Sequence, residues 1–329
     1  MTDLRHAPPR TSRRTGPKPT FAEFTKPILD GGHPPDGNST NGFNVADLFS
    51  PLLGGDLSLA NRIVMAPLTR SRAGADGVPT ETMAEHYAQR ASVGLIISEG
   101  TFQSLPGKAS DGQPGLVTTA QLAGSRKVTD AVHAEGRLIV AQVMHAGRAT
   151  HPDISEFPVE APSALAIDGE TRAGGTKVAY PLPRERATNE LPEIVRTLVL
   201  SSQNAVDAGF DGVELHAASG YVLHEFLGAT SNVRTDPYGG TPENRIRFVV
   251  EVVQAVVAQL GAGRVGIRIS PERNIQDLIE DDPADVEAVY GGLIDALAPP
   301  GLAFVRVLHP NPPAPWSKDS ELYLADPSS

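Results

Sequence analysis

Short apolar runs alternate with amphipathic stretches between Leu48 and Leu308. The apolar runs have the length of buried strands, and they are Arg62–Leu68, Gly94–Ser98, Leu138–Met144, Gly212–His216, Val265–Ser270 and Leu302–Leu308. The stretches between them repeat apolar residues at helical spacing, and they are Glu81–Ser92, Thr119–Glu135, Leu191–Ala208, Pro242–Leu260 and Asp285–Leu297. Buried strands that alternate with helices predict an α/β fold with a parallel sheet and helices packed against it.

Residues at the ends of the predicted helices support these bounds. Thr118 and Thr188 are suitable N-caps, because a hydroxyl oxygen can accept from the free N–H groups of a first helical turn. Pro242 suits a first helical position, where no N–H is needed. Gly209 and Gly261 follow helix ends, where the backbone commonly turns left-handed.

Several predicted strands end in polar or small residues. These residues are Thr69, Arg70, Glu99, Gly100, Gln142, His145, His216 and Arg268. In a parallel α/β barrel the active site lies at the carboxyl ends of the strands. A doubly wound sheet would instead concentrate glycines in one phosphate loop, and no GxGxxG or P-loop pattern follows any predicted strand. We therefore predict a TIM-type barrel.

The first 45 residues differ in composition from the rest of the chain. They hold seven Pro, five Gly, six basic and four acidic residues without hydrophobic periodicity, so we predict a disordered tail over residues 1–45. The whole chain has 28 basic and 39 acidic residues and a net charge of −11. This charge argues against a nucleic-acid partner, since phosphate binding needs clustered Lys and Arg.

Composition excludes several further classes. The chain has no Cys, which removes disulfide frameworks, thiolate zinc sites, iron–sulfur clusters and thiol nucleophiles. His133, His145 and His224 have no metal-like spacing with carboxylates, so we predict no metal site. No apolar run approaches the roughly 18 residues that span a bilayer, and no apolar signal core follows the N-terminus. We expect a cytoplasmic protein with no membrane contact.

A set of motifs stands in order along the chain. The segments are Asn61–Arg70, Ile97–Thr101, Ala141–Arg148, Ala161–Ala164, Ala208–His216, Asn232–Gly240 and Glu243–Arg245. Together they resemble the Old Yellow Enzyme family of FMN-dependent ene-reductases, over about residues 47–308. The resemblance implies a (β/α)8 barrel that binds FMN non-covalently at the strand carboxyl ends and uses NAD(P)H as reductant.

The resemblance also implies which residues contact the flavin. The positions that match are Pro67, Thr69, Gly100, Gln142 and Arg268. Thr69 would hydrogen-bond the flavin O4 edge, while Gln142 and Arg268 would bind the pyrimidine edge and the ribityl region. A cation at the pyrimidine would also favour the anionic reduced flavin.

Three residues match the substrate side of the family's site. The resemblance implies that His216 hydrogen-bonds the carbonyl oxygen of an α,β-unsaturated substrate and that Tyr221 is the proton donor. These residue types suit the reaction, which needs a donor at the developing enolate oxygen and a proton for the α-carbon. Ser219 stands where the family has Asn or His, so we expect a weaker or water-mediated second contact. Met144 and Ser125 also replace aromatic residues common in the family.

The pattern supplies six βα units rather than eight. After Leu308 come a Pro-rich segment, His309–Trp316, and a short polar stretch, and neither indicates two more units of roughly 30 residues each. We therefore predict a barrel-type oxidoreductase domain over residues 46–329 that lacks the last two βα units. The loops that hold the FMN phosphate in this family belong to those two units, so we expect them to be missing as well.

Two functions follow from these observations. One is an FMN-dependent ene-reductase that acts on small α,β-unsaturated compounds, and the other is a flavin-deficient, non-catalytic relative or a fragment that needs another chain. A barrel hydrolase or aldolase would need a Schiff-base Lys or paired carboxylates, and Glu99 and Glu214 are the only acids near the predicted strand ends. The sequence leaves the physiological substrate, the choice of NADH or NADPH and the oligomeric state open, a homo-oligomer included.

Overall fold

The computed structural model describes residues 48–308 and 321–323. The tail predicted for residues 1–45 lies outside the described residues, as does the Pro-rich segment His309–Trp316. All the elements named below belong to the described part of the chain.

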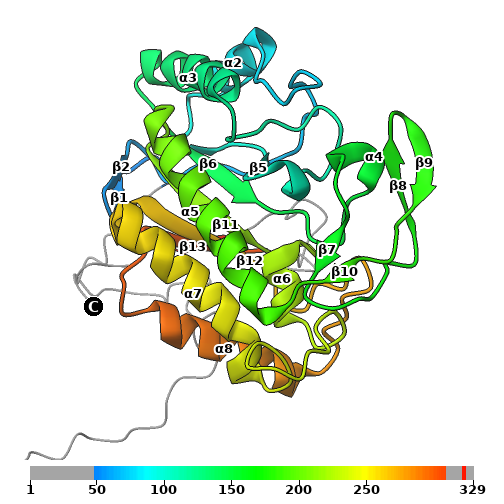
Figure 1. Cartoon of the computed structure of the whole chain (residues 1–329). Coiled ribbons are helices and arrows are strands. Elements are labelled where there is room, and N and C mark those ends of the chain that lie inside the picture. Colours follow the sequence, from blue (N-terminus) through cyan, green and yellow to red (C-terminus); the bar gives the residue numbers. More distant parts are fainter. Residues whose placement is uncertain (1–47, 309–320, 324–329) are drawn as a thin grey trace, which may run out of the picture. The chain divides into compact units, whose positions relative to one another are not determined.

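A curled sheet with six parallel strands forms the centre of the described residues (Figure 1). In spatial order these strands are β3 (Val64–Met65), β4 (Leu95–Ile97), β6 (Leu138–Met144), β11 (Gly212–Ala217), β12 (Val265–Ile269) and β13 (Phe304–Val307). The short strand β5 (Thr101–Phe102) also pairs with β6, and β14 (Glu321–Tyr323) runs antiparallel to β13. The predicted α/β fold is confirmed, and the six parallel strands form an incomplete (β/α)8 barrel within the described residues.

Helices connect these strands and lie on the outer face of the sheet (Figure 1). The connecting helices are α2 (Glu81–Ala88), α3 (Thr119–Ala134), α5 (Leu191–Asp207), α7 (Pro242–Leu260) and α8 (Pro283–Leu297). All five were predicted, and α2 ends four residues earlier than its pattern indicated. The strand predicted over Arg62–Leu68 is shorter than expected, because only Val64 and Met65 pair with β4 at this edge of the sheet and Pro67 has no N–H to donate.

Helix starts follow the predicted chemistry in two of three cases. Thr118 and Gln121 form a reciprocal capping box at the start of α3, and Pro242 stands in the first turn of α7. The prediction for Thr188 is wrong. This residue lies in a 3₁₀ turn, Thr188–Glu190, and its hydroxyl donates to Asp236, while α5 begins after Glu190.

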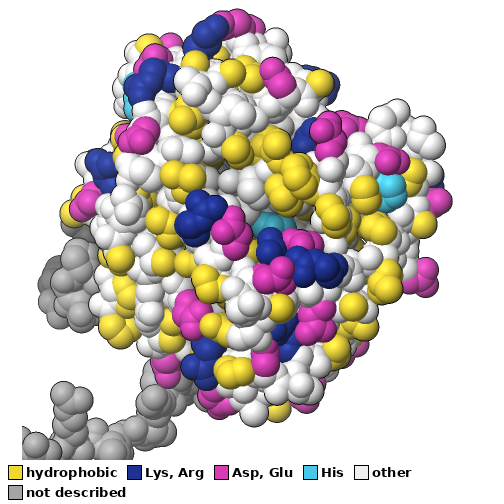
Figure 2. Space-filling view, in the orientation of Figure 1, with side chains coloured by type: hydrophobic (Ala, Val, Ile, Leu, Met, Phe, Trp, Pro, Cys, Tyr) yellow, Lys and Arg dark blue, Asp and Glu magenta, His cyan; other side chains and the backbone are white. Residues whose placement is uncertain are grey.

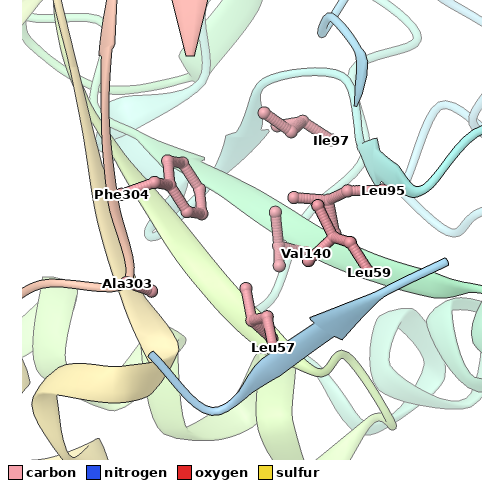
Figure 3. Close-up of a cluster of buried hydrophobic side chains, with 7 residues drawn as sticks. All are labelled: Leu57, Leu59, Leu95, Ile97, Val140, Ala303 and Phe304. Carbon is pink, nitrogen blue, oxygen red and sulfur yellow. The ribbon is translucent and has the colours of Figure 1, made fainter. Parts of the chain in front are cut away.

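The N-terminal ends of the strands enclose an apolar core. An unpredicted hairpin, β1 (Leu52–Gly54) and β2 (Leu57–Leu59), packs into it (Figure 3). The core residues are Leu57, Leu59, Leu95, Ile97, Val140, Ala303 and Phe304. Residues of β4 and β13, four places apart in the sheet, belong to the same core, as the curl of the sheet allows. The hairpin therefore closes the interior at one end and leaves the carboxyl ends of the strands free for polar residues.

An excursion between β6 and α5 lies beyond the carboxyl end of β6. Its elements are α4 (Pro152–Ser155), β7 (Glu160–Ala161), β8 (Glu170–Ala173), β9 (Thr176–Ala179) and β10 (Arg184–Glu185). Strands β8 and β9 form an antiparallel hairpin, while β7 and β10 pair in parallel. None of these short elements was predicted. Within the described ranges, no helix is both long enough and apolar enough to cross a membrane.

Candidate functional site

Polar side chains from neighbouring strands meet at the carboxyl end of the curled sheet. The parallel register aligns Gln142 with Glu214, and it aligns His216 with Arg268 and Arg268 with Arg306. Since side chains alternate along a strand, each of these pairs projects to one face. On the face of the molecule shown in Figure 2, acidic and basic side chains are interspersed, and hydrophobic side chains gather beside a histidine.

A buried carboxylate links three of these strands. Glu214 of β11 is fully buried and accepts from Arg306 of β13 through two hydrogen bonds, both of 2.6 Å. The side-chain amide nitrogen of Gln142 on β6 also donates to Glu214, at 2.6 Å. The two-pronged contact with a guanidinium compensates the cost of burying the carboxylate. Glu214 and Arg306 are therefore fixed in place beneath the polar end of the sheet.

His216 and Tyr221 lie in edge-to-face contact, with ring centroids 5.0 Å apart and an interplanar angle of 74°. Burial lowers the pKa of His216 well below 6.5, and the nearby cations Arg268 and Arg306 lower it further, so the imidazole is neutral. Burial also raises the pKa of Tyr221, which keeps the phenol protonated. The pair thus offers a neutral imidazole and a phenolic proton, side by side.

The turn between these two rings is tight. Ser219 and Gly220 both have positive φ angles, 57° and 77°, and Tyr221 then leads into the short helix α6 (Val222–Leu227). The N–H of Ser219 donates to the Ser270 hydroxyl across 3.0 Å, which joins this turn to the end of β12. The left-handed region favours Gly and Asn, so Ser219 occupies a backbone position that an asparagine would also fit. The structure shows a role for its backbone and no hydrogen bond of its hydroxyl to another described residue.

Arg268 lies among like charges. Burial lowers the pKa of this guanidinium to about 10, and Arg306 and Arg273 act in the same direction, against the opposing carboxylate of Glu214. The Nε of Arg268 and the Nδ1 of His216 are buried and have no hydrogen-bond partner among the described residues. Such a group of cations and unpaired nitrogens fits a ligand that carries acceptor atoms and partial negative charge.

The remaining predicted flavin residues lie at the ends of β3 and β4. Pro67 is half-buried and Thr69 is exposed, and both follow β3. Gly100 is buried just after β4, and a Cβ atom there would lie 2.4 Å from the Met144 sulfur. The absence of a side chain at Gly100 therefore makes room for the Met144 side chain at the carboxyl end of the sheet.

Glu214 and Arg306 are site residues that the sequence prediction did not include. A signal was present for Glu214, since it stands two residues before His216 in the same predicted strand and must project to the same face. Arg306 interrupts an otherwise apolar strand, which indicates a buried partner. Only the register of the sheet shows that the two residues pair.

Comparison with known proteins decides the family. The model of the NADH:flavin oxidoreductase / NADH oxidase family matches residues 47–312. The chain belongs to this family. A probable flavin mononucleotide-dependent alkene reductase of Leishmania infantum is 44% identical over 243 residues, which cover 72% of this chain and 67% of that protein.

Solved structures give the same result. The Old Yellow Enzyme homologue of Zymomonas mobilis is 40% identical and superposes with a TM-score of 0.77, covering 80% of this chain and 73% of that one. Morphinone reductase in complex with tetrahydroNAD is 43% identical with a TM-score of 0.75, covering 79% and 73%. The predicted membership of the Old Yellow Enzyme family and the barrel-type fold are both confirmed.

The match to this FMN-dependent family spans part of each relative. The chain spans between 61% and 70% of the length of the curated relatives it matches. The described structure places the eight positions predicted to form the site at the carboxyl ends of β3, β4, β6, β11 and β12 or shortly after them. These positions are Pro67, Thr69, Gly100, Gln142, His216, Ser219, Tyr221 and Arg268.

Proposed function

We propose that this protein is an FMN-dependent NAD(P)H oxidoreductase that reduces the activated C=C bond of small α,β-unsaturated carbonyl compounds. The observation that carries the proposal is the contact between a neutral His216 and a protonated Tyr221 at the polar end of an Old Yellow Enzyme barrel. We assign the activity to the domain of residues 46–329.

The residues present fit a flavin. Pro67, Thr69, Gly100, Gln142 and Arg268 would hold it, with the unpaired Nε of Arg268 available to an acceptor. When bound, FMN supplies the hydride that no side chain can provide. The cations around Arg268 stabilise negative charge at the edge of the site that they face.

His216 acts as a hydrogen-bond donor to the substrate oxygen. Because its imidazole is neutral, it donates without transferring a proton, and negative charge that develops on the carbonyl oxygen strengthens the bond. One such preorganised donor contributes roughly 3 kcal/mol of transition-state stabilisation. The edge contact with Tyr221 restricts the orientation of the imidazole ring.

Tyr221 holds the proton for the α-carbon. The raised pKa keeps the phenol protonated at neutral pH, and the adjacent Arg268 stabilises the phenolate that forms when the proton leaves. The turn at Ser219 and Gly220 fixes the phenol close to His216. Oxygen stabilisation and protonation are therefore performed by neighbouring residues on one segment.

The test is reconstitution with FMN followed by the two half-reactions in a stopped-flow instrument. The wild type is expected to bind FMN, to be reduced by NADH or NADPH, and to be reoxidised by cyclohexenone. His216→Ala is expected to slow reoxidation about 100-fold with little change in flavin reduction, and Tyr221→Phe to slow reoxidation alone. His133→Ala and Tyr238→Phe, on outer surfaces, serve as matched controls.

A purified protein that shows no flavin absorbance after incubation with FMN would contradict the proposal. That result would favour the flavin-deficient alternative or a fragment completed by another chain. Equal losses in both half-reactions for His216→Ala would contradict the role of this residue, while leaving FMN binding in place.

A further inference from the structure

His224 is a buried histidine that the proposed mechanism does not use. It lies in α6, three residues after Tyr221, and its side chain is fully buried. Its Nδ1 atom accepts from the main-chain N–H of Gly220 across 2.9 Å. Gly220 immediately precedes Tyr221, so this hydrogen bond ties the turn that carries the phenol to the first turn of the helix.

The arrangement is a variant of a helix capping box. Tyr221 is the N-cap of α6, and His224 stands three residues later, where a side chain normally accepts from the N-cap N–H. Here the acceptor reaches one residue further back, to Gly220, whose backbone is left-handed with a φ of 77°. This N–H is buried, and a buried N–H without an acceptor costs free energy. The imidazole therefore stabilises this particular geometry of the turn.

The bond to Gly220 also fixes which nitrogen of His224 carries the ring proton. A main-chain N–H only donates, so Nδ1 is the acceptor and the proton resides on Nε2. Nε2 lies 3.0 Å from the hydroxyl oxygen of Tyr290 in α8 and 3.3 Å from Oε1 of Glu280. The hydroxyl of Tyr290 donates in turn to Glu280 across 2.8 Å. In this network each of the three donors has an acceptor.

The partners of Nε2 are themselves held in place. Tyr290 is fully buried, and burial together with the charge of Glu280 raises its pKa well above 10, so the phenol keeps the proton that it donates. The main-chain N–H of Glu280 donates to the Asn274 side chain across 2.8 Å. The imidazole of His224 thus cannot rotate without breaking its contacts with α8 and with the loop that precedes α8.

We propose that His224 is a positioning residue for proton transfer from Tyr221: its Nδ1 holds the Gly220 N–H and thereby fixes the place of the phenol beside His216. The inference rests on the proposed function. The rings of Tyr221 and His216 are in edge-to-face contact, so a shift of the turn would move the proton donor away from the oxygen donor. A displacement of about 1 Å at a reacting group can cost roughly 100-fold in rate.

Two amide substitutions separate the two nitrogens of the imidazole. In His224→Asn the amide oxygen takes the place of Nδ1 and can accept from Gly220, whereas in His224→Gln the amide reaches the place of Nε2 instead. His224→Leu removes both functions. We expect reoxidation of the reduced flavin by cyclohexenone to slow about 10- to 100-fold in His224→Leu and His224→Gln. In His224→Asn it should stay within about threefold of the wild-type rate, and flavin reduction by NADH or NADPH should change less than about twofold in all three variants.

Two further measurements distinguish positioning from a general loss of structure. Reoxidation by ferricyanide, a one-electron acceptor that needs no proton on carbon, should be unchanged in His224→Leu. In a Tyr221→Phe background, His224→Leu should slow reoxidation by cyclohexenone less than about twofold further, because the proton donor is already absent. His133→Leu, at an exposed position of α3, is the matched control, and circular dichroism establishes that each variant is folded. Losses that multiply in the double variant would overturn the proposal, as would a His224→Asn variant as slow as His224→Leu.

Hydrogen exchange without flavin separates this inference from the proposed function. The Gly220 amide is expected to exchange slowly in the wild type and in His224→Asn, and at least about 10-fold faster in His224→Leu and His224→Gln. Equally slow exchange in all four proteins would overturn the hold of His224 on the turn. Failure of the wild type to bind FMN would overturn the proposed function and the role in proton transfer, while the exchange result would still decide whether His224 holds Gly220.

Discussion

The main-chain N–H of Arg70 donates to the buried carboxylate of Glu99 across 3.0 Å. Glu99 is held from its other side by the hydroxyl of Tyr87, at 3.3 Å, and its own N–H donates to that hydroxyl at 2.8 Å. The segment after β3 carries Pro67 and Thr69, so one side chain at the end of β4 determines where two predicted flavin contacts lie. The hydrogen bond between Arg70 and Glu99 thus connects the pairing of β3 with β4 to the shape of the site.

Replacing Glu99 tests that connection. Glu99→Ala leaves the Arg70 N–H without its acceptor, and we expect the free energy of unfolding to fall by about 1 to 3 kcal/mol. Urea unfolding followed by circular dichroism measures the change. Glu85→Gln, on the exposed face of α2, is the control and is expected to stay within about 0.5 kcal/mol. Equal stabilities for the two variants would show that Glu99 does not hold this segment.

The pH dependence of reoxidation tests the state of His216. Because burial and two arginines keep its pKa well below 6.5, the imidazole is neutral from pH 6 to 9 and its donor ability does not change. We expect the rate of flavin reoxidation by an enone to show no inflection near pH 6.5 in stopped-flow measurements. An inflection in that range that disappears in His216→Asn would contradict the neutral imidazole.

Substituting Gly100 tests the close packing of β4 against Met144 at the carboxyl end of the sheet. A Cβ atom there would lie 2.4 Å from the flexible Met144 side chain, so Gly100→Ala is expected to cost about 1 kcal/mol of stability. FMN affinity is expected to fall at least roughly 10-fold, because the methyl group displaces the Met144 side chain beside the positions proposed to hold the flavin. Gly291→Ala is the control, since nothing lies within 4 Å and the residue is inside helix α8. It should raise stability by about 0.5 to 1 kcal/mol and leave FMN affinity unchanged.

The buried carboxyl of Glu225 should make the free energy of unfolding depend on pH. Burial raises the pKa of this carboxyl from 4.5 to about 8, so the folded state holds the proton more tightly than the unfolded state. The contribution of this carboxyl to the free energy of unfolding is therefore largest below pH 4.5. It falls by about 4 kcal/mol as pH rises from 4.5 to 8. In Glu225→Gln the titrating group is absent, and this loss should disappear.

Urea unfolding at several pH values measures that slope. The wild type and the exposed-site control Glu287→Gln should lose stability in parallel, while Glu225→Gln should remain nearly level through the same range. A variant whose stability falls as steeply as that of the wild type would assign the slope to other groups.

Local chemistry allowed much of the fold to be predicted. The helix over Pro242–Leu260 and the strand over Leu138–Met144 were predicted to the residue, because their apolar spacing and terminal residues lie within a single element. Thr188 could not be placed correctly in the same way. Its hydroxyl donates to Asp236, 48 residues away, and not to the first turn of helix α5, which begins at Leu191.

The candidate site shows the same division. His216 and Tyr221 stand five residues apart, and the motif around them was sufficient to nominate both. The pair of Glu214 and Arg306 is separated by 92 residues, and no local pattern joins them. Their partnership requires β11, β12 and β13 to be neighbours in the right register.

The sequence by itself determined the family, the order of strands and helices, and the residues nominated for flavin and substrate. Only the tertiary structure decided that the Gln142 amide donates to Glu214, that Glu99 holds the segment carrying Thr69, and that a hairpin near the N-terminal ends of the strands fills the interior. The physical reason is the range of the interactions. Periodicity and capping act within one element, whereas the direction of a buried polar group depends on partners that strand register and sheet curvature bring together.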